Sequence, residues 1–276
     1  MANFTVADIK TLREQTGAGM LDVKKALDEA GGDHAKAAEI LRVKGQKGVT
    51  KREARTTSNG LVAAKAENGV GTLVEVLCET DFVAKSERFI ALAEQILDQA
   101  IASNVSDADA LLKSTLADGR TVQELVDQSN AVIGEKIEVK RVARVEGERV
   151  AAYLHKTSPD LPAQIGVLVA IAGGDDQVAR DIAMHAAALP PTALTRDDIP
   201  AETVENERRL AEATAREEGK PEAAMSRIVE GRVNGFFKDN VLIEQAFAKD
   251  QKKTVGQVLK DAKAEAQAFA RFRVGS

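Results

Sequence analysis

The sequence predicts an α+β protein: a small three-helix domain followed by a core of two related halves, each an antiparallel sheet covered by helices. Three observations predict this class. The N-terminal residues have the apolar spacing of short helices. A diverged repeat follows, with strand-like alternation in both copies. A charged, helix-prone segment then separates the second copy from a strand-like run near the C-terminus.

The N-terminal domain and its basic linker, residues 1–54, are predicted from three short helices. The residues expected to cap or stop these helices are Thr5, Gly17, Gly19, Gly31, Gly32, Asp33 and Gly45. Helices this short are not stable alone, so the three must pack on one another. The pattern resembles a ubiquitin-associated type of domain. The basic run at residues 42–55 is either a contact with nucleic acid or the ribosome, or a solvated linker. We favour the linker because no aromatic side chain is interleaved.

The core is predicted from a repeat with an offset of 95 residues. Gly71 and Gly166 each begin an apolar run, and Asp81 and Asp176 each follow it (166 − 71 = 176 − 81 = 95). An earlier strand leads into the apolar run in both copies. Each copy is therefore interpreted as a β-hairpin followed by a helix.

These two copies define the halves of the core. The first half is expected at residues 55–145, where residues 137–145 form a further strand that could pair with either hairpin. The second half is expected at residues 146–200 and 236–276. The alternating run at 266–274 is its last strand, so a long excursion must separate this strand from its sheet.

Residues 201–235 form that excursion and are predicted to be a helical hairpin. Its two charged helices are joined at Gly219-Lys220-Pro221, and Pro221 can begin the second helix. The apolar positions available for a seam are few: Val204, Leu210, Ala211, Ala224, Met225, Ile228 and Val229. Such a hairpin should project from the body. It either contacts a partner or a second copy of the chain, or is a solvated structural arm.

Composition and charge exclude several function classes. The 276 residues are 44% hydrophobic and 29% charged, with a net charge of −5, which argues against a general nucleic-acid binder. No apolar run is long enough to span a membrane, and the first residues lack the features of a signal peptide. The single Cys78 excludes an internal disulfide and is interpreted as buried. We therefore expect a cytoplasmic protein that does not contact membranes.

Residues that could perform bond chemistry are scarce. His34, His155 and His185 are far apart, and none belongs to a pair with metal-binding spacing. The sequence has no nucleophile elbow and no Walker-type phosphate loop. We expect no catalytic residue, no cofactor and no metal site, and therefore no enzymatic activity.

The strongest candidate for a functional site is the junction Thr80-Asp81-Phe82-Val83. At an arbitrary strand–helix junction, Asp81 would cap the helix and Phe82 would anchor it in the core. The repeat argues otherwise, because Phe82 corresponds to Gln177 whereas the next two positions are apolar in both copies. We therefore expect Phe82 to face solvent, where an aromatic side chain is best explained as an interface anchor.

Five motifs carry a family resemblance: Thr80-Asp81-Phe82-Val83-Ala84-Lys85, Leu12-Arg13-Glu14-Gln15-Thr16-Gly17-Ala18-Gly19-Met20, Ile165-Gly166-Val167-Leu168-Val169-Ala170, Ile182-Ala183-Met184-His185 and Thr254-Val255-Gly256-Gln257. Together they resemble the bacterial translation elongation factor Ts family over essentially the whole chain. The resemblance implies a non-enzymatic guanine nucleotide exchange factor for elongation factor Tu. Compared with enterobacterial members, no helical segment is expected after the last strand.

The resemblance also implies roles for particular residues. Asp81 and Phe82, flanked by Thr80 and Val83, would push into the nucleotide domain of elongation factor Tu and disturb its magnesium site. Phe82 would supply apolar contact on the order of 2 kcal/mol when fully buried.

Other residues would dock the partner. Positions matching Arg13, Met20 and Leu21 would contact the nucleotide domain of elongation factor Tu, and His155 would contact its distal domain. The hairpin at 201–235 corresponds to a coiled-coil arm, for which self-association stays open. Two other functions also stay open: a helix- or peptide-binding adaptor, and an RNA-binding ribosomal accessory protein, which the acidic net charge disfavours.

Overall fold

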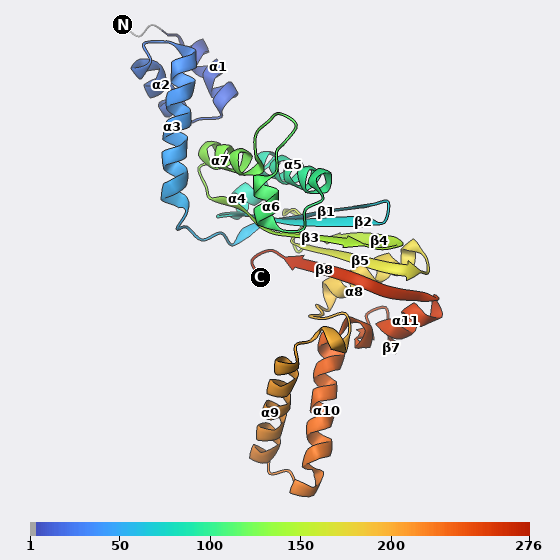
Figure 1. Cartoon of the computed structure of the whole chain (residues 1–276). Helices are drawn as coiled ribbons and strands as arrows, with labels where there is room; N and C mark the ends of the chain where they lie inside the picture. The colour runs from blue at the N-terminus through green and yellow to red at the C-terminus, as the bar shows by residue number, and fades with distance from the viewer. Residues whose placement is uncertain (1–3) are drawn as a thin grey trace.

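The computed structural model describes residues 4–276, and the side chains of all of these except residues 46–51. A small helical domain lies at one end, a core of two sheets lies in the middle, and a helical arm lies at the other end (Figure 1). The predicted α+β class is confirmed. Within the described part of the chain, no helix is long and apolar enough to cross a membrane.

The N-terminal domain consists of α1 (Val6–Thr16), α2 (Met20–Glu29) and α3 (His34–Arg52). The Thr5 hydroxyl accepts a hydrogen bond from the Asp8 amide, and the Asp8 carboxylate accepts one from the Thr5 amide, so α1 begins with a capping box. The three helices enclose a small apolar core of Leu12, Val23, Ala26, Leu27, Ala37 and Leu41.

The third helix is longer than predicted. It continues past Gly45 to Arg52, so most of the expected linker is helical; the side chains of Lys47 and Lys51 lie outside the described residues. Glycine at position 45 allows α3 to pass close to α7, because an added Cβ would lie 2.7 Å from the Cβ of Ala131. The helix therefore connects the N-terminal domain directly to the core.

The first half of the core contains a three-stranded antiparallel sheet in the order β1-β2-β3, formed by Asn59–Glu67, Val70–Cys78 and Ile137–Glu146. Asn68 and Gly69 make the two-residue turn of the first hairpin, both with positive φ. The strand left unassigned by the sequence, β3, pairs with β2. The accompanying helices are α4 (Asp81–Ala84), α5 (Glu87–Ser103), α6 (Ala108–Lys113) and α7 (Val122–Ile133).

The second half repeats this arrangement with the order β4-β5-β8, formed by Arg149–His155, Ile165–Gly173 and Ala264–Arg273. Its main helix, α8, runs from Asp176 to Ala188. The last strand reaches its sheet after the arm, as predicted. Several smaller elements were not predicted from the sequence: two 3₁₀ turns, η1 (Arg196–Asp198) and η2 (Leu242–Glu244), the short hairpin β6 (Ala246–Phe247) and β7 (Asp250–Thr254), and α11 (Val255–Asp261).

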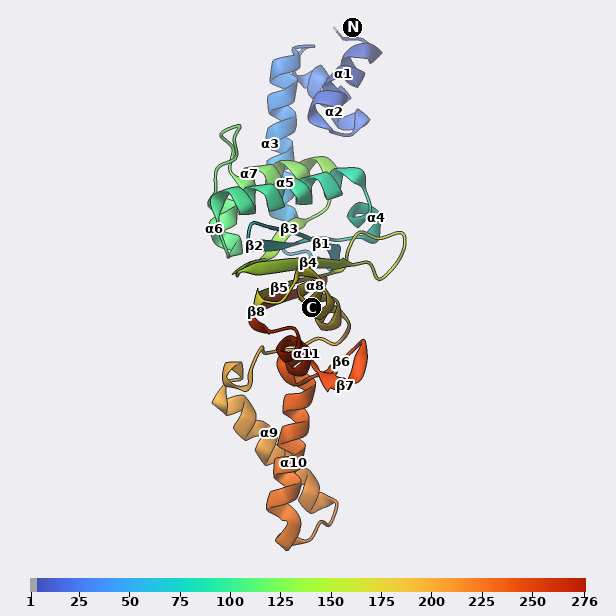
Figure 2. The same cartoon turned by 90° about the vertical axis from the view of Figure 1, so that its right-hand side faces the viewer.

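The two sheets pack face to face, and helices cover their outer faces, giving four layers (Figures 1 and 2). Equivalent residues of the two copies make the contact between the sheets. An added Cβ on Gly71 would lie 3.0 Å from Leu168, and one on Gly166 would lie 2.6 Å from Leu73. Leu73 and Leu168 are themselves 95 residues apart (168 − 73 = 95). Each half therefore inserts the same leucine against the same glycine of the other half.

The strand registers repeat as well. The ladder between β2 and β3 shifts between Glu75 and Val76. The ladder between β5 and β8 shifts between Ala170 and Ile171, which is the same offset (170 − 75 = 95). An irregularity placed identically in both sheets confirms that the two halves share one fold.

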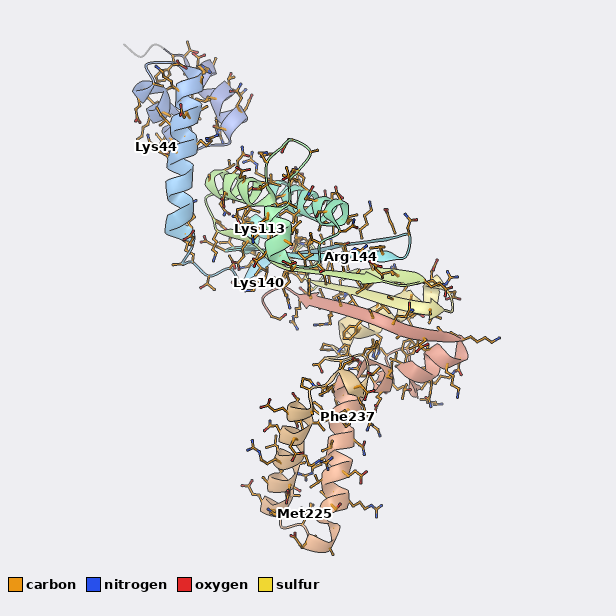
Figure 3. The ribbon with its side chains drawn as sticks, viewed as in Figure 1. Lys44, Lys113, Lys140, Arg144, Met225 and Phe237 are labelled. Carbon is orange, nitrogen blue, oxygen red and sulfur yellow. The ribbon has the colours of Figure 1, made fainter. Side chains whose placement is uncertain are left out.

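The arm consists of α9 (Ala201–Glu217) and α10 (Glu222–Asn240), so the second helix extends beyond the expected end at residue 235. Figure 3 shows Met225 toward the tip of the arm and Phe237 toward the body. The buried seam contains Ala211, Ala215, Met225, Val229, Val233 and Phe237. Leu210, which was expected in this seam, is 58% exposed, so that assignment is wrong.

Candidate functional site

The junction between β2 and α4 begins at a buried strand end. Cys78 is buried, as predicted, and burial together with the nearby Glu135 carboxylate raises the pKa of its thiol to about 12. Thr80 then has an extended backbone, and its hydroxyl accepts a hydrogen bond from the Val83 amide at 3.3 Å. Thr80 therefore caps α4, whereas the cap position discussed for the sequence was Asp81, which is instead the first helical residue.

Phe82 projects from this short helix into solvent. Its exposed fraction is 74%, whereas Val83 is half-buried and Ala84 is only 1% exposed, packed in the core beneath the first sheet. The prediction that Phe82 faces outward is confirmed. An exposed aromatic ring on a capped helix offers apolar surface, and burying this surface against another protein would stabilise the complex.

Lys85 joins the other two exposed side chains of the junction. Its ammonium group lies 3.1 Å from the Asp81 carboxylate and 4.7 Å from the centre of the Phe82 ring. The ion pair is largely exposed, so it contributes little to stability. It does bring a carboxylate, an ammonium group and an aromatic ring together at the tip.

Ser86 separates α4 from the long helix that follows. Its hydroxyl donates a hydrogen bond to the Val83 carbonyl at 2.8 Å and accepts one from the Phe89 amide at 3.3 Å. The repeat predicted a single helix after the hairpin. The break instead makes α4 a short unit of its own at the edge of the core (Figure 2).

Glu79, just before the junction, is held by the segment that leads into β3. Its carboxylate accepts a hydrogen bond from the Lys136 amide at 2.6 Å and lies 3.2 Å from the Arg55 guanidinium. Partial burial would raise the pKa of Glu79, but the hydrogen bonds from Lys136 and Arg55 outweigh it and lower the pKa below its ordinary value. Sequence reasoning missed Glu79, because its partner is remote in the chain.

The equivalent junction of the second half has a different tip. The Asp175 carboxylate caps α8 by accepting a hydrogen bond from the Val178 amide at 2.9 Å. Gln177, the counterpart of Phe82, is exposed and donates a hydrogen bond to Asp181. In both junctions an extended capping residue is followed by a helix, but the second tip presents polar side chains.

The remaining predicted site residues lie elsewhere. Arg13, Met20 and Leu21 are exposed on α1 and α2, Met20 by 59% and Leu21 by 73%. His155 ends β4, where its Nδ1 lies 3.2 Å from the Tyr153 hydroxyl, and both residues border a cavity of about 470 Å³. The structure therefore places the candidates in three separate parts of the chain and does not gather them in one pocket (Figure 1).

Among the described residues, no group of three or more His, Cys, Asp or Glu side chains is placed to hold a metal ion. Phe82, Arg13, Met20, Leu21 and His155 are exposed, whereas Thr80, Asp81 and Val83 are half-buried. Fold and site together define an α+β protein whose candidate residues lie on separate parts of its surface.

Comparisons with known proteins specify the class further. The sequence model of a family described as "Elongation factor TS" matches residues 79–276. Proteins named "Elongation factor Ts" from Kineococcus radiotolerans, Paenarthrobacter aurescens and Kocuria rhizophila are 62%, 61% and 61% identical to this chain. Each alignment covers both chains in full. The chain belongs to the elongation factor Ts family, which confirms the resemblance found in the motifs.

Proposed function

We propose that this protein is the guanine nucleotide exchange factor for elongation factor Tu and promotes release of GDP so that GTP can bind. The observation that carries the proposal is the exposed Phe82 ring on the capped tip of α4. The family assignment supports the choice of partner. No bond is made or broken by this chain in the proposed reaction.

The physical basis of exchange is linkage. A nucleotide held by phosphate contacts and Mg²⁺ loses affinity when the ligands of the metal shift, because the phosphate charge is then less well compensated. A protein that binds the nucleotide-free conformer more tightly must lower nucleotide affinity by the same factor, since coupling between two binding sites is reciprocal. Differential binding is therefore sufficient to explain the activity.

Within this proposal, Thr80, Asp81, Phe82 and Val83 form the part that displaces the magnesium site of the partner. Phe82 supplies apolar area that becomes buried in the complex, and Asp81 supplies a carboxylate near the metal network. Thr80 and Val83 hold the backbone turn through the hydrogen bond that caps α4. Lys85 must release or share Asp81 when the partner offers another cation.

The other parts of the chain would provide affinity. We assign docking on the nucleotide domain to Arg13, Met20 and Leu21, and contact with the distal domain to His155. The division behind these roles is the one expected from the sequence: 1–54, 55–145, 146–200 with 236–276, and the arm. The arm at 201–235 would contact a partner or a second copy of this chain.

The test is stopped-flow release of a fluorescent GDP from elongation factor Tu. The wild-type chain should accelerate release, and Phe82→Ala or Asp81→Ala should reduce that acceleration at saturating concentration. Absence of acceleration by the wild type would contradict the function and leave an adaptor role as the alternative. Full acceleration by both variants would contradict the assignment of the tip alone.

Deletion of residues 1–51 tests the docking role separately. The truncated chain should need a higher concentration for half-maximal acceleration, while the rate at saturation changes less. A reduced saturated rate at unchanged half-saturation would contradict docking by Arg13, Met20 and Leu21. A cytoplasmic location and the absence of direct nucleic-acid binding belong to the same proposal.

A further inference from the structure

Glu135 lies opposite the residue that caps the tip helix. Its carboxylate accepts two hydrogen bonds from Thr80, one from the amide at 3.0 Å and one from the hydroxyl at 2.6 Å. Because the hydroxyl proton points to Glu135, a lone pair of the same oxygen is left to accept from the Val83 amide. Glu135 thereby fixes both the backbone and the rotamer of the residue that begins α4.

A second carboxylate makes the connection reciprocal. Glu79 accepts from the Lys136 amide, so the neighbours Glu79 and Thr80 are bonded in both directions to the neighbours Glu135 and Lys136. Hydrogen bonds that involve an ionised partner are stronger and shorter than neutral ones. We call these four residues the carboxylate clamp.

The segment that carries Glu135 is itself held in place. Gly134 ends α7 in a left-handed conformation and donates to the Asn130 carbonyl at 3.0 Å. The Asn130 side chain then exchanges hydrogen bonds with the backbone of Ile137, at 2.6 and 3.3 Å. The clamp therefore ties the tip to a buried, hydrogen-bonded corner of the first half.

The second half shows that the shared fold does not need this clamp. The pair Cys78 and Ile137 in the first sheet corresponds to Gly173 and Ala264 in the second. Glu79, the residue after Cys78, thus corresponds to Gly174. Glu135, two residues before Ile137, corresponds to Ala262. Neither counterpart has a carboxylate, yet hairpin and helix form the same arrangement. The clamp occurs in the half whose tip carries Phe82.

We propose that Glu135 is a positioning residue for exchange, which holds the Thr80 cap and thereby fixes the direction in which Phe82 projects. This inference rests on the function proposed above. A tip free to rotate about the junction would still bind the partner, but Phe82 would less often point in the direction that displaces the partner's magnesium site. Loss of the clamp therefore lowers the saturated release rate more than it raises the concentration for half-maximal effect.

The experiment compares GDP release from elongation factor Tu in the presence of the wild type, Glu135→Ala and Glu135→Gln. Glu135→Ala should lower the saturated rate about tenfold, with half-saturation changed less than about twofold. Glu135→Gln can accept only one of the two bonds from Thr80, so its rate should lie between those of Glu135→Ala and the wild type.

Glu148 provides the matched control. Its carboxylate accepts a hydrogen bond from the Gly173 amide at 3.0 Å, at the end of the equivalent strand in the second half. Glu148→Ala should therefore accelerate GDP release from elongation factor Tu as much as the wild type does. Hydrogen exchange separates positioning from general loss of stability. The Thr80 and Val83 amides should exchange faster in Glu135→Ala, while amides in the middle of β2 and α5 should not change.

The outcomes distinguish the two proposals. If the wild type accelerates release and Glu135→Ala is equally fast at saturation, the positioning role is wrong and the exchange function stands. If Glu135→Ala fails to fold, Glu135→Gln carries the same test, and a wild-type rate with that variant overturns the positioning role. If the wild type does not accelerate release, the exchange function is wrong and the positioning role falls with it.

Discussion

The two strand–helix junctions of the core have equivalent places in the repeated fold but present different side chains to solvent. In the first, Thr80 caps a four-residue helix and Phe82 points into solvent; in the second, Asp175 caps a long helix and Gln177 takes the exposed place. The buried position that follows, Ala84 or Ala179, is alanine in both. Inward positions therefore preserve the fold in each half, whereas the outward position is free to acquire a function.

The largest expected effect comes from making the first tip like the second. Phe82→Gln places at position 82 the side chain that the second half carries at the equivalent exposed position, so the fold should be unchanged. Removing an apolar anchor whose burial contributes about 2 kcal/mol should slow saturated GDP release roughly thirtyfold. The measurement is stopped-flow release, with Gln177→Ala as control. An equal loss of the saturated release rate in Phe82→Gln and Gln177→Ala would contradict the functional difference between the two tips.

The inter-sheet glycines should behave alike in both halves. An added Cβ would lie 2.7 Å from Val150 in the variant Gly71→Ala and 2.5 Å from Val62 in Gly166→Ala, so each forces a packed interface apart. Each variant should lower the free energy of unfolding by about 1.5 kcal/mol, measured by urea denaturation. A large loss in only one variant would show that the two sheets do not pack by equivalent contacts.

Mild acid should weaken the second half through His185. This buried ring accepts from the Ala248 amide at Nδ1 and lies 2.9 Å from Gln245 at Nε2. Burial lowers the pKa of His185 below 6.5, and the hydrogen bond to Gln245 only partly opposes this.

Because the unfolded chain binds the proton more readily, this contribution to stability is complete above pH 6.5. It is lost as the pH falls from there through the lowered pKa. Urea denaturation at pH 7.5 and 5.5 should therefore show a smaller loss on acidification for His185→Gln than for the wild type. An equal loss in both proteins would contradict this assignment.

The smallest effect is expected for Lys85. Its ion pair with Asp81 and its contact with the Phe82 ring are both exposed, so Lys85→Ala should change saturated release by no more than about twofold. Arg180, the counterpart of Lys85 in the second half, provides the control variant Arg180→Ala. A loss as large as that of Phe82→Gln would mean that Lys85 itself contacts the partner.

Local patterns were sufficient to predict most of the fold. The repeat offset and the alternation near residue 270 predicted both hairpins and the late strand, because these patterns are visible in the sequence without knowledge of tertiary contacts. The offset also predicted the exposure of Phe82, since Gln177 marked that position as outward.

Features that depend on remote contacts could not be predicted. Gly45 indicated the end of a helix, but in the structure it lets α3 pass close to Ala131. The sequence around Glu135 did not indicate its role, because its hydrogen bond to Thr80 joins residues 55 positions apart. That the second half has Ala262 in place of Glu135 becomes visible only once β3 is paired with β2 and β8 with β5. Knowing the strand pairing first would have identified this difference.

Site-specific photo-crosslinking tests the central claim most directly. A benzophenone amino acid placed at position 82 keeps an aromatic side chain at the tip, and the same amino acid at position 177 reports on the second tip. We predict that position 82 crosslinks to the nucleotide domain of elongation factor Tu and that position 177 does not. Failure of position 82 to crosslink to that domain, or equal crosslinking from position 177, would contradict the account.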